Sequence, residues 1–152
     1  MDVVLFSPEI PQNTGSVARL CAGTGVGLHL VGPLGFSLED RYLKRAGLDY
    51  WGDVCLGVHK DLDSLLTRFA GRPVYFLSKK AERRYTDVAW TGEEVLVFGP
   101  ESTGLPDWVL GRYGDACLRI PVRPSIRSLN LAAAVHVVVY HALERLGFPG
   151  IP

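Results

Sequence analysis

The strongest constraint on the fold is a repeated alternation of short apolar runs with segments of helical spacing. The runs are apolar throughout and bounded by turn residues, which is typical of strands buried on both faces of a sheet. Strands that alternate with helices predict an α/β fold, with a parallel sheet flanked by helices. We expect strands at 3–6, 28–32, 53–58, 74–78, 94–99 and 117–122, and helices at 13–25, 38–47, 61–71 and 128–146.

The chain is predicted to form one domain over residues 1–152, because it contains no internal repeat, linker or low-complexity tract. Its 47% apolar and 21% charged residues are typical of a globular protein and exclude general disorder. The formal net charge is zero, so an RNA partner would have to bind to local patches. The first apolar run is very short and has no basic region before it, so we expect no signal peptide and a cytoplasmic location.

The three cysteines, Cys21, Cys55 and Cys117, are scattered and form no Cys-x-x-Cys pair. Neither a disulfide framework nor a zinc site is therefore favoured. We expect small buried hydrophobic residues in a reducing compartment, and no metal.

Three glycines occur within residues 23–27, GTGVG, and two interpretations of them imply different functions. In a dinucleotide-binding protein such glycines follow a strand and open a helix, whose N-terminus meets the pyrophosphate. Here they follow a helix and precede a strand, which favours a helix C-cap and a tight return. We therefore expect the chemistry in segments that begin where strands end.

The first such segment is 8–20, PEIPQNTGSVARL. Its two prolines fix an extended loop, and Asn13 or Thr14 can cap the helix that follows. Arg19 lies about a turn and a half further on, where it could face the loop. The alternative is a capped helix with a solvent-exposed arginine.

The second segment, 95–106, joins a strongly apolar strand to GPESTGLP. Gly99 would let a ligand approach the backbone at the carboxyl end of the strand, where open α/β sheets bind ligands. Glu101 stands at the same edge. The segment is not a P-loop, and a simple turn is the alternative.

The third segment places three arginines, the last of them Arg127, before a long helix with Ser128 as its expected cap. That helix is apolar around most of its circumference, but polar residues interrupt it too often for a membrane span. Such a helix must be covered on several sides, which indicates a homodimer interface. His136 and His141 lie in the body of the helix, so we expect them to pack rather than to react.

Basic clusters at 41–47 and 79–85 have aromatic neighbours. The usual interpretation of such clusters is a solvated face. Together with the three late arginines, they could instead form a local phosphate-binding surface on a neutral protein.

Taken in order and spacing, these three segments resemble the three motifs of the SPOUT class of RNA methyltransferases. The resemblance is closest to the subfamily that methylates the ribose 2′-oxygen of the wobble cytidine or uridine of tRNA. The sequences PLGF at 33–36, LKRAGLDYW at 43–51 and LGFPG at 146–150 also resemble that subfamily, so the match spans nearly the whole chain.

The resemblance implies an α/β fold with a C-terminal trefoil knot, a rare exception to unknotted topology. It also implies a homodimer through the knot and the last helix, tRNA as the partner, and S-adenosylmethionine as the cofactor. By position in the motifs, the cofactor contacts would be Leu77, Gly99, Glu101, Ile120, Ser128 and Leu129. The RNA contacts would be Arg41, Lys44, Arg45, Arg123 and Arg127.

The resemblance assigns activation of the 2′-hydroxyl to Arg19, with Asn13, Glu101 and Asn130 as the other catalytic positions. Arginine stays protonated in proteins and is a poor general base. We therefore prefer the hypothesis that Arg19 stabilises the forming alkoxide and grips the adjacent phosphate.

The last motif departs from the subfamily pattern, because Ile126, Ala132 and Ala133 replace polar residues. This puts some loop hydrogen bonds in question, and with them the substrate preference. Three other functions are considered: methylation of another tRNA or rRNA nucleotide, a nicotinamide-dependent oxidoreductase, and a non-catalytic RNA-binding protein. The second would need a glycine-rich turn after the first strand, and the third would not need the four catalytic positions together.

Overall fold

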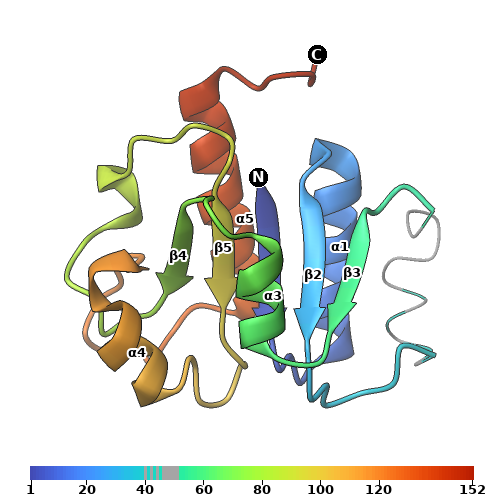
Figure 1. The fold of residues 1–152 in the computed structure, drawn as a ribbon, viewed down its shortest axis with the longest axis horizontal. Helices are drawn as coiled ribbons and strands as arrows, with labels where there is room; N and C mark the ends of the chain where they lie inside the picture. Colours follow the sequence, from blue (N-terminus) through green and yellow to red (C-terminus); the bar gives the residue numbers. More distant parts are fainter. Residues whose placement is uncertain (40, 42, 44, 46–51) are drawn as a thin grey trace.

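The computed structural model describes residues 1–39, 41, 43, 45 and 52–152. Its centre is a six-stranded sheet in the order β3-β2-β1-β5-β4-β6, and every strand pair is parallel (Figure 1). This confirms the α/β fold expected from the alternating pattern. The strands are β1 (Asp2–Phe6), β2 (Gly27–Val31), β3 (Leu56–His59), β4 (Val74–Leu77), β5 (Val95–Phe98) and β6 (Cys117–Leu118).

Helices cover both faces of the sheet. On one face lie α1 (Pro11–Thr24) and α5 (Leu131–Leu146), which also pack against each other; α3 (Leu62–Arg68) and α4 (Asp107–Tyr113) lie on the other face (Figure 1). Two short 3₁₀ turns, Tyr85–Asp87 and Gly114–Ala116, complete the regular structure described. Alternate side chains of each central strand enter the two cores, as with Val3 toward α1 and α5, and Val4 toward α3 and α4.

The strand order reverses direction between β1 and β5. From β1 the chain proceeds outward to β2 and β3, whereas β5 and β4 lie on the other side of β1. The loops that follow β1 and β5 therefore leave adjacent strands toward opposite faces, to α1 and to α4 (Figure 1). Open α/β sheets bind ligands at this kind of switch point, at the carboxyl ends of the strands.

Two helices begin elsewhere than the sequence suggests. Helix α1 begins at Pro11 with Ile10 as its N-cap, so the prediction that Asn13 or Thr14 caps it is wrong. Proline is pre-organised for the first helical position, so the helix begins at Pro11, two residues before the expected start. Helix α5 begins at Leu131, where the Asn130 side chain accepts a hydrogen bond from the backbone of the first turn. Ser128 is therefore not the cap.

The glycines at 23–27 end a helix, as predicted. Gly25 adopts a left-handed conformation with φ of 71°, and its N–H donates to the carbonyl of Cys21. Half of the residues of the helix expected at 38–47 lie outside the described residues, and Arg41, Leu43 and Arg45 are helical. Within the part of the chain that the structure describes, no helix has the length and apolar content to cross a membrane.

Four titratable side chains form a hydrogen-bonded chain on the α3 side of the sheet. Asp2 accepts from Arg72 at 2.6 Å and lies 3.0 Å from Nε2 of His29, whose Nδ1 lies 3.0 Å from Nε2 of His59. Burial alone would raise the pKa of Asp2, but the hydrogen bonds from His29 and Arg72 outweigh it and lower the pKa to about 2. The network therefore holds a charged carboxylate at the start of the central strand.

Candidate functional site

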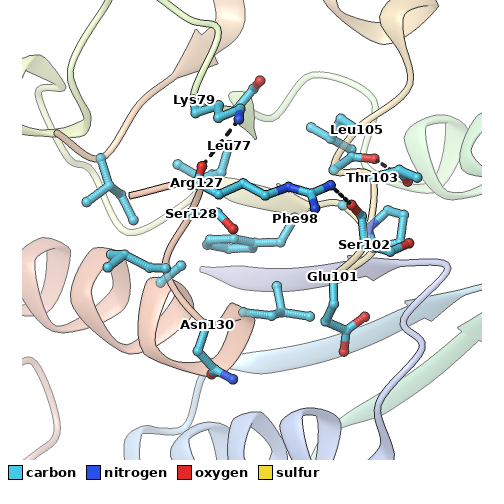
Figure 2. A pocket seen from close by; sticks show the side chains of 18 of the residues that line it. Leu77, Lys79, Phe98, Glu101, Ser102, Thr103, Leu105, Arg127, Ser128 and Asn130 are labelled. Atoms are coloured by element: carbon cyan, nitrogen blue, oxygen red, sulfur yellow. Dashed lines mark hydrogen bonds between the residues drawn. The ribbon is translucent and has the colours of Figure 1, made fainter. Parts of the chain in front are cut away.

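A cavity of about 440 Å³ opens at the carboxyl edge of the sheet, beside the switch point. Three stretches of chain form most of it: residues 77–80 at the end of β4, residues 98–105 at the end of β5, and residues 120–131 before and into α5. Ile10 and Asn13, at the start of α1, also line it. Figure 2 shows side chains from these stretches converging on one space. The volume is typical of sites for small organic ligands.

The cavity combines apolar walls with a few polar groups. The apolar contributors include Leu77, Phe98 and Ile120, and hydroxyls come from Ser78, Thr103 and Ser128. Apolar surface suits a flat ring system, whereas hydroxyl and backbone groups can fix its orientation by hydrogen bonds. The lining therefore suits a nucleoside-like ligand with a polar tail.

One hydrogen-bond network joins the three sequence segments beside this cavity. The Glu101 carboxylate accepts from the backbone N–H of Glu9 at 2.7 Å and of Ile10 at 3.0 Å, and from Nδ2 of Asn13 at 3.1 Å. Asn130 donates to Oδ1 of Asn13 at 2.9 Å, and its own Oδ1 accepts the N–H of Ala133 at 3.2 Å. Asn13 is thus held at both ends of its amide, which fixes how its side chain points.

A second network lies at the rim and involves residues that the sequence did not single out. The Glu9 carboxylate accepts from the N–H of Ser102 at 2.9 Å and from its hydroxyl at 2.7 Å. The carbonyl of Ser102 accepts from Nη2 of Arg127 at 2.8 Å, and the carbonyl of Arg127 accepts from Nζ of Lys79 at 3.3 Å (Figure 2). The only sequence signal for Glu9 and Ser102 was their position in strand-end loops.

Gly99 has a structural reason for its lack of a side chain. A Cβ at this position would press on the amide nitrogen of Leu105 and lie 2.5 Å from the carbonyl carbon of Gly104. The loop after β5 turns back on itself here, with Gly104 in the left-handed region at φ of 70°. A ligand was expected to approach the backbone closely at Gly99, but the atoms that lie closest to this position belong to the backbone of residues 104–105.

Most of the predicted site residues line the cavity. They are Asn13, Leu77, Gly99, Glu101, Ile120, Arg127, Ser128, Leu129 and Asn130. Arg19 lies instead on the exposed side of α1, outside the lining. Arg41, Arg45 and Arg123 are exposed and also outside it, and Lys44 is not among the described residues.

The chain matches a protein-family model over residues 1–140, the SpoU rRNA Methylase family. The match includes every residue that lines the cavity and ends within α5. The chain belongs to this family. The cavity of this chain includes residues of all three segments that resemble the SPOUT motifs. Among the described residues, no group of three or more His, Cys, Asp or Glu side chains is placed to hold a metal.

Known proteins resemble the chain over nearly its full length. A tRNA (cytidine(34)-2′-O)-methyltransferase of Methylovorus glucosotrophus is 45% identical over 150 residues, covering 98% of this chain and 97% of that protein. A structure described as "Structural insights into the 2-OH methylation of C/U34 on tRNA" has a TM-score of 0.92 and 45% identity, covering 96% of this chain and 95% of the other. The AdoMet-bound rRNA methyltransferase of Sinorhizobium meliloti has a TM-score of 0.84 and 26% identity, covering 95% of this chain and 56% of that one.

Proposed function

We propose that the protein transfers a methyl group from S-adenosylmethionine to the ribose 2′-oxygen of the wobble pyrimidine of tRNA. The observation that carries the proposal is the network of Glu101, Asn13 and Asn130 at the cavity, in a chain 45% identical to a relative named for position 34. These side chains are up to 117 residues apart in sequence, yet they meet beside one ligand-sized space. A non-catalytic RNA-binding protein would have no need of that arrangement.

The residues present fit S-adenosylmethionine. The apolar walls at Leu77 and Ile120 suit the adenine ring, and the backbone beside Gly99 and the hydroxyl of Ser128 can bind the polar groups. Leu129 would close the apolar side. When bound, the cofactor would supply an electrophilic methyl group on a sulfonium; transfer of that group to the 2′-oxygen leaves a neutral thioether, needs no acid, and releases the hydroxyl proton to water.

The protein's own contribution is to hold and polarise the acceptor hydroxyl. A ribose hydroxyl is a poor nucleophile unless its proton is removed or its developing charge is stabilised. We assign this stabilisation to the guanidinium of Arg19, which is exposed on α1. Asn13, Glu101 and Asn130 fix the start of the same helix and the cavity loops relative to each other.

The RNA is proposed to dock on exposed cations around this edge. Arg41, Arg45 and Arg123 are exposed, as phosphate-binding side chains must be, and Lys44 belongs to the same proposal from sequence alone. Arg127 differs from these, because its guanidinium already donates to the carbonyl of Ser102. We therefore assign Arg127 a role at the cavity rim, in addition to a contact with the RNA.

The proposal includes a homodimer through α5. Ala133, Val137 and Tyr140 form an exposed apolar stripe along this helix, with Val137 40% and Tyr140 51% exposed. The opposite side of the helix is already covered by the sheet and α1. The same stripe on a second copy of the chain would cover it, because a twofold interface pairs the same surface of both subunits.

The trefoil knot and a cytoplasmic location are also part of the proposal. Support for the knot comes from residues 120–131, which share one cavity with the loops after β4 and β5. The location follows from tRNA as the substrate.

The test is methyl transfer from labelled S-adenosylmethionine to unmodified and to native total tRNA, followed by mapping of the label to one nucleotide. We expect label in the ribose of a wobble pyrimidine. Label at another tRNA position, or only with rRNA, would keep the reaction and reject the substrate. The family's rRNA name and the Sinorhizobium neighbour make rRNA the second candidate to include.

A further inference from the structure

Ser102, in the loop after β5, joins that loop at the rim to the loop after β1 and to the stretch before α5. Its N–H and hydroxyl donate to Glu9 in the loop after β1, and its carbonyl accepts from Arg127 in the stretch before α5. Every hydrogen-bonding group of this residue except the hydroxyl lone pairs is therefore engaged from outside its own loop. Ser102 itself lines the cavity, together with Thr103 and Gly104.

Glu9 does not line the cavity, yet both of its carboxylate oxygens are directed to Ser102. The backbone of Glu9 is itself tightly held. Its N–H donates to Glu101, and Gly35 packs so closely that a Cβ there would lie 2.8 Å from the Cα of Glu9. The loop after β1 therefore carries this carboxylate as a fixed group rather than as a mobile one.

The two loops are tied together reciprocally by two carboxylates. Glu101 of the loop after β5 binds the loop after β1, and Glu9 of the loop after β1 binds the loop after β5. Glu101 acts on the inner side, next to Asn13, whereas Glu9 acts at the exposed rim. Hydrogen bonds to a carboxylate are shorter and stronger than hydrogen bonds between neutral groups, so each of the two carboxylates links the two loops strongly.

A negative charge at this rim needs an explanation, because the proposed substrate is a polyanion. An exposed carboxylate beside a docked RNA repels phosphates and lowers affinity. Binding Ser102 gives Glu9 a role that offsets this cost. Arg127, which carries the opposite charge, donates to the carbonyl of Ser102. Ser102 therefore lies between an anionic and a cationic side chain at the rim.

We propose that Glu9 is a positioning residue that acts through Ser102 to hold the rim of the cofactor cavity, with Arg127 as the second support of the same residue. The proposal rests on the proposed function, in that the cavity takes S-adenosylmethionine. Glu9 does not touch the cofactor or the reacting atoms. Its loss loosens the backbone at 102–104 and so weakens cofactor binding, while the Glu101 network remains.

The experiment measures equilibrium binding of S-adenosylmethionine and of tRNA, with kcat and both KM values, in wild type, Glu9→Ala, Glu9→Gln and Ser102→Ala. We expect Glu9→Ala to weaken cofactor binding roughly tenfold, since two hydrogen bonds to a charged group are lost at an exposed site. KM for the cofactor should rise with kcat changed much less, and tRNA affinity should not fall. Glu9→Gln should recover part of the loss, because its amide oxygen still accepts one hydrogen bond.

The matched control is Glu93→Ala, which removes an exposed glutamate at the opposite edge of the sheet, in the turn before β5. It should leave cofactor binding unchanged. A double-mutant cycle of Glu9→Ala with Ser102→Ala should show losses smaller than additive, because both changes remove the hydroxyl hydrogen bond. Backbone hydrogen exchange at 102–104 should speed up in Glu9→Ala while that of β1 and α1 stays as in wild type.

Cofactor affinity equal to wild type in Glu9→Ala would overturn the inference and leave the methyltransferase function standing. A fall in tRNA affinity alone would also overturn it, and would make Glu9 an RNA-facing group. A wild-type protein that binds no S-adenosylmethionine would overturn both. If Glu9→Ala melts well below wild type, Glu9→Gln and Ser102→Ala decide the question in folded protein.

Discussion

Replacing Gly99 with alanine tests whether the folded-back loop after β5 builds the cofactor cavity. The new Cβ would lie 2.5 Å from the carbonyl carbon of Gly104, and ordinary contact begins near 3.4 Å. The loop would have to retreat by at least about 0.9 Å, because the amide nitrogen of Leu105 lies closer still. The obstructing atoms belong to the backbone of residues 104–105, so no side chain can rotate away to relieve the contact.

The expected cost follows from that displacement. Overpacking of a well-packed site costs about 1–3 kcal/mol in folding free energy. For a domain of this size each 1 kcal/mol lowers Tm by about 2–4 °C. Because Gly104 and Leu105 line the cavity, the same shift moves part of its wall, and a misplacement near 1 Å can weaken function by up to about a hundredfold.

The assay is thermal unfolding together with calorimetric binding of S-adenosylmethionine. Gly111→Ala is the matched control, because Gly111 lies within α4 and a Cβ there meets no atom within 4 Å. Alanine within a helix should stabilise by about 0.5–1 kcal/mol and leave binding unchanged. A Gly99→Ala protein with wild-type Tm and wild-type cofactor affinity would refute the reasoning, since the loop would then have room that the structure does not show.

Three further predictions concern the acceptor, the pH dependence and the assembly. Arg19→Lys should lower kcat at neutral pH while cofactor affinity stays as in wild type; near-normal turnover would contradict a specific guanidinium role. The pKa of Asp2 is about 2 in the folded state and 3.8 otherwise, so its stabilisation of roughly 2 kcal/mol is present above pH 4 and is lost as the pH falls toward 2. Urea unfolding of wild type and Asp2→Asn should therefore differ at pH 6 and converge near pH 2, and a constant difference would exclude the charge as the cause. Val137→Glu should convert a dimer to a monomer in sedimentation experiments, and an unchanged mass would remove α5 from the interface.

The strands and the sheet class could be predicted because the pattern that encodes them is local. β5 reads as the unbroken apolar run Val95–Phe98, and burial on both faces leaves no other option for it. The helix starts were less predictable, because several residues compete to begin each helix. Asn13 and Ser128 were the expected caps, yet Asn130 caps α5, and the Asn13 side chain binds two other side chains instead.

The site could be predicted only as far as the family motifs extend. Glu101 and Asn13 were expected to act together, but the hydrogen bond that joins them spans 88 residues, and no local pattern encodes it. Glu9 and Ser102 were missed because exposed polar residues in loops have no periodicity that distinguishes a bound side chain from a solvated one. Position after a strand was the single available indication, and it does not say which loop residue is used.

The central place of β1 in the sheet has a consequence for synthesis on the ribosome. β1 leaves the ribosome before its neighbour β5, which ends at Phe98, and before α5, which covers the same face as α1 and begins at Leu131. Until then Val17 and Ala18 lack part of their core, and Asn13 lacks its partner Asn130. A nascent chain that stops before residue 131 would leave the apolar face of the sheet that α5 covers exposed, so the cavity and its hydrogen-bond network can assemble only after α5 has been made.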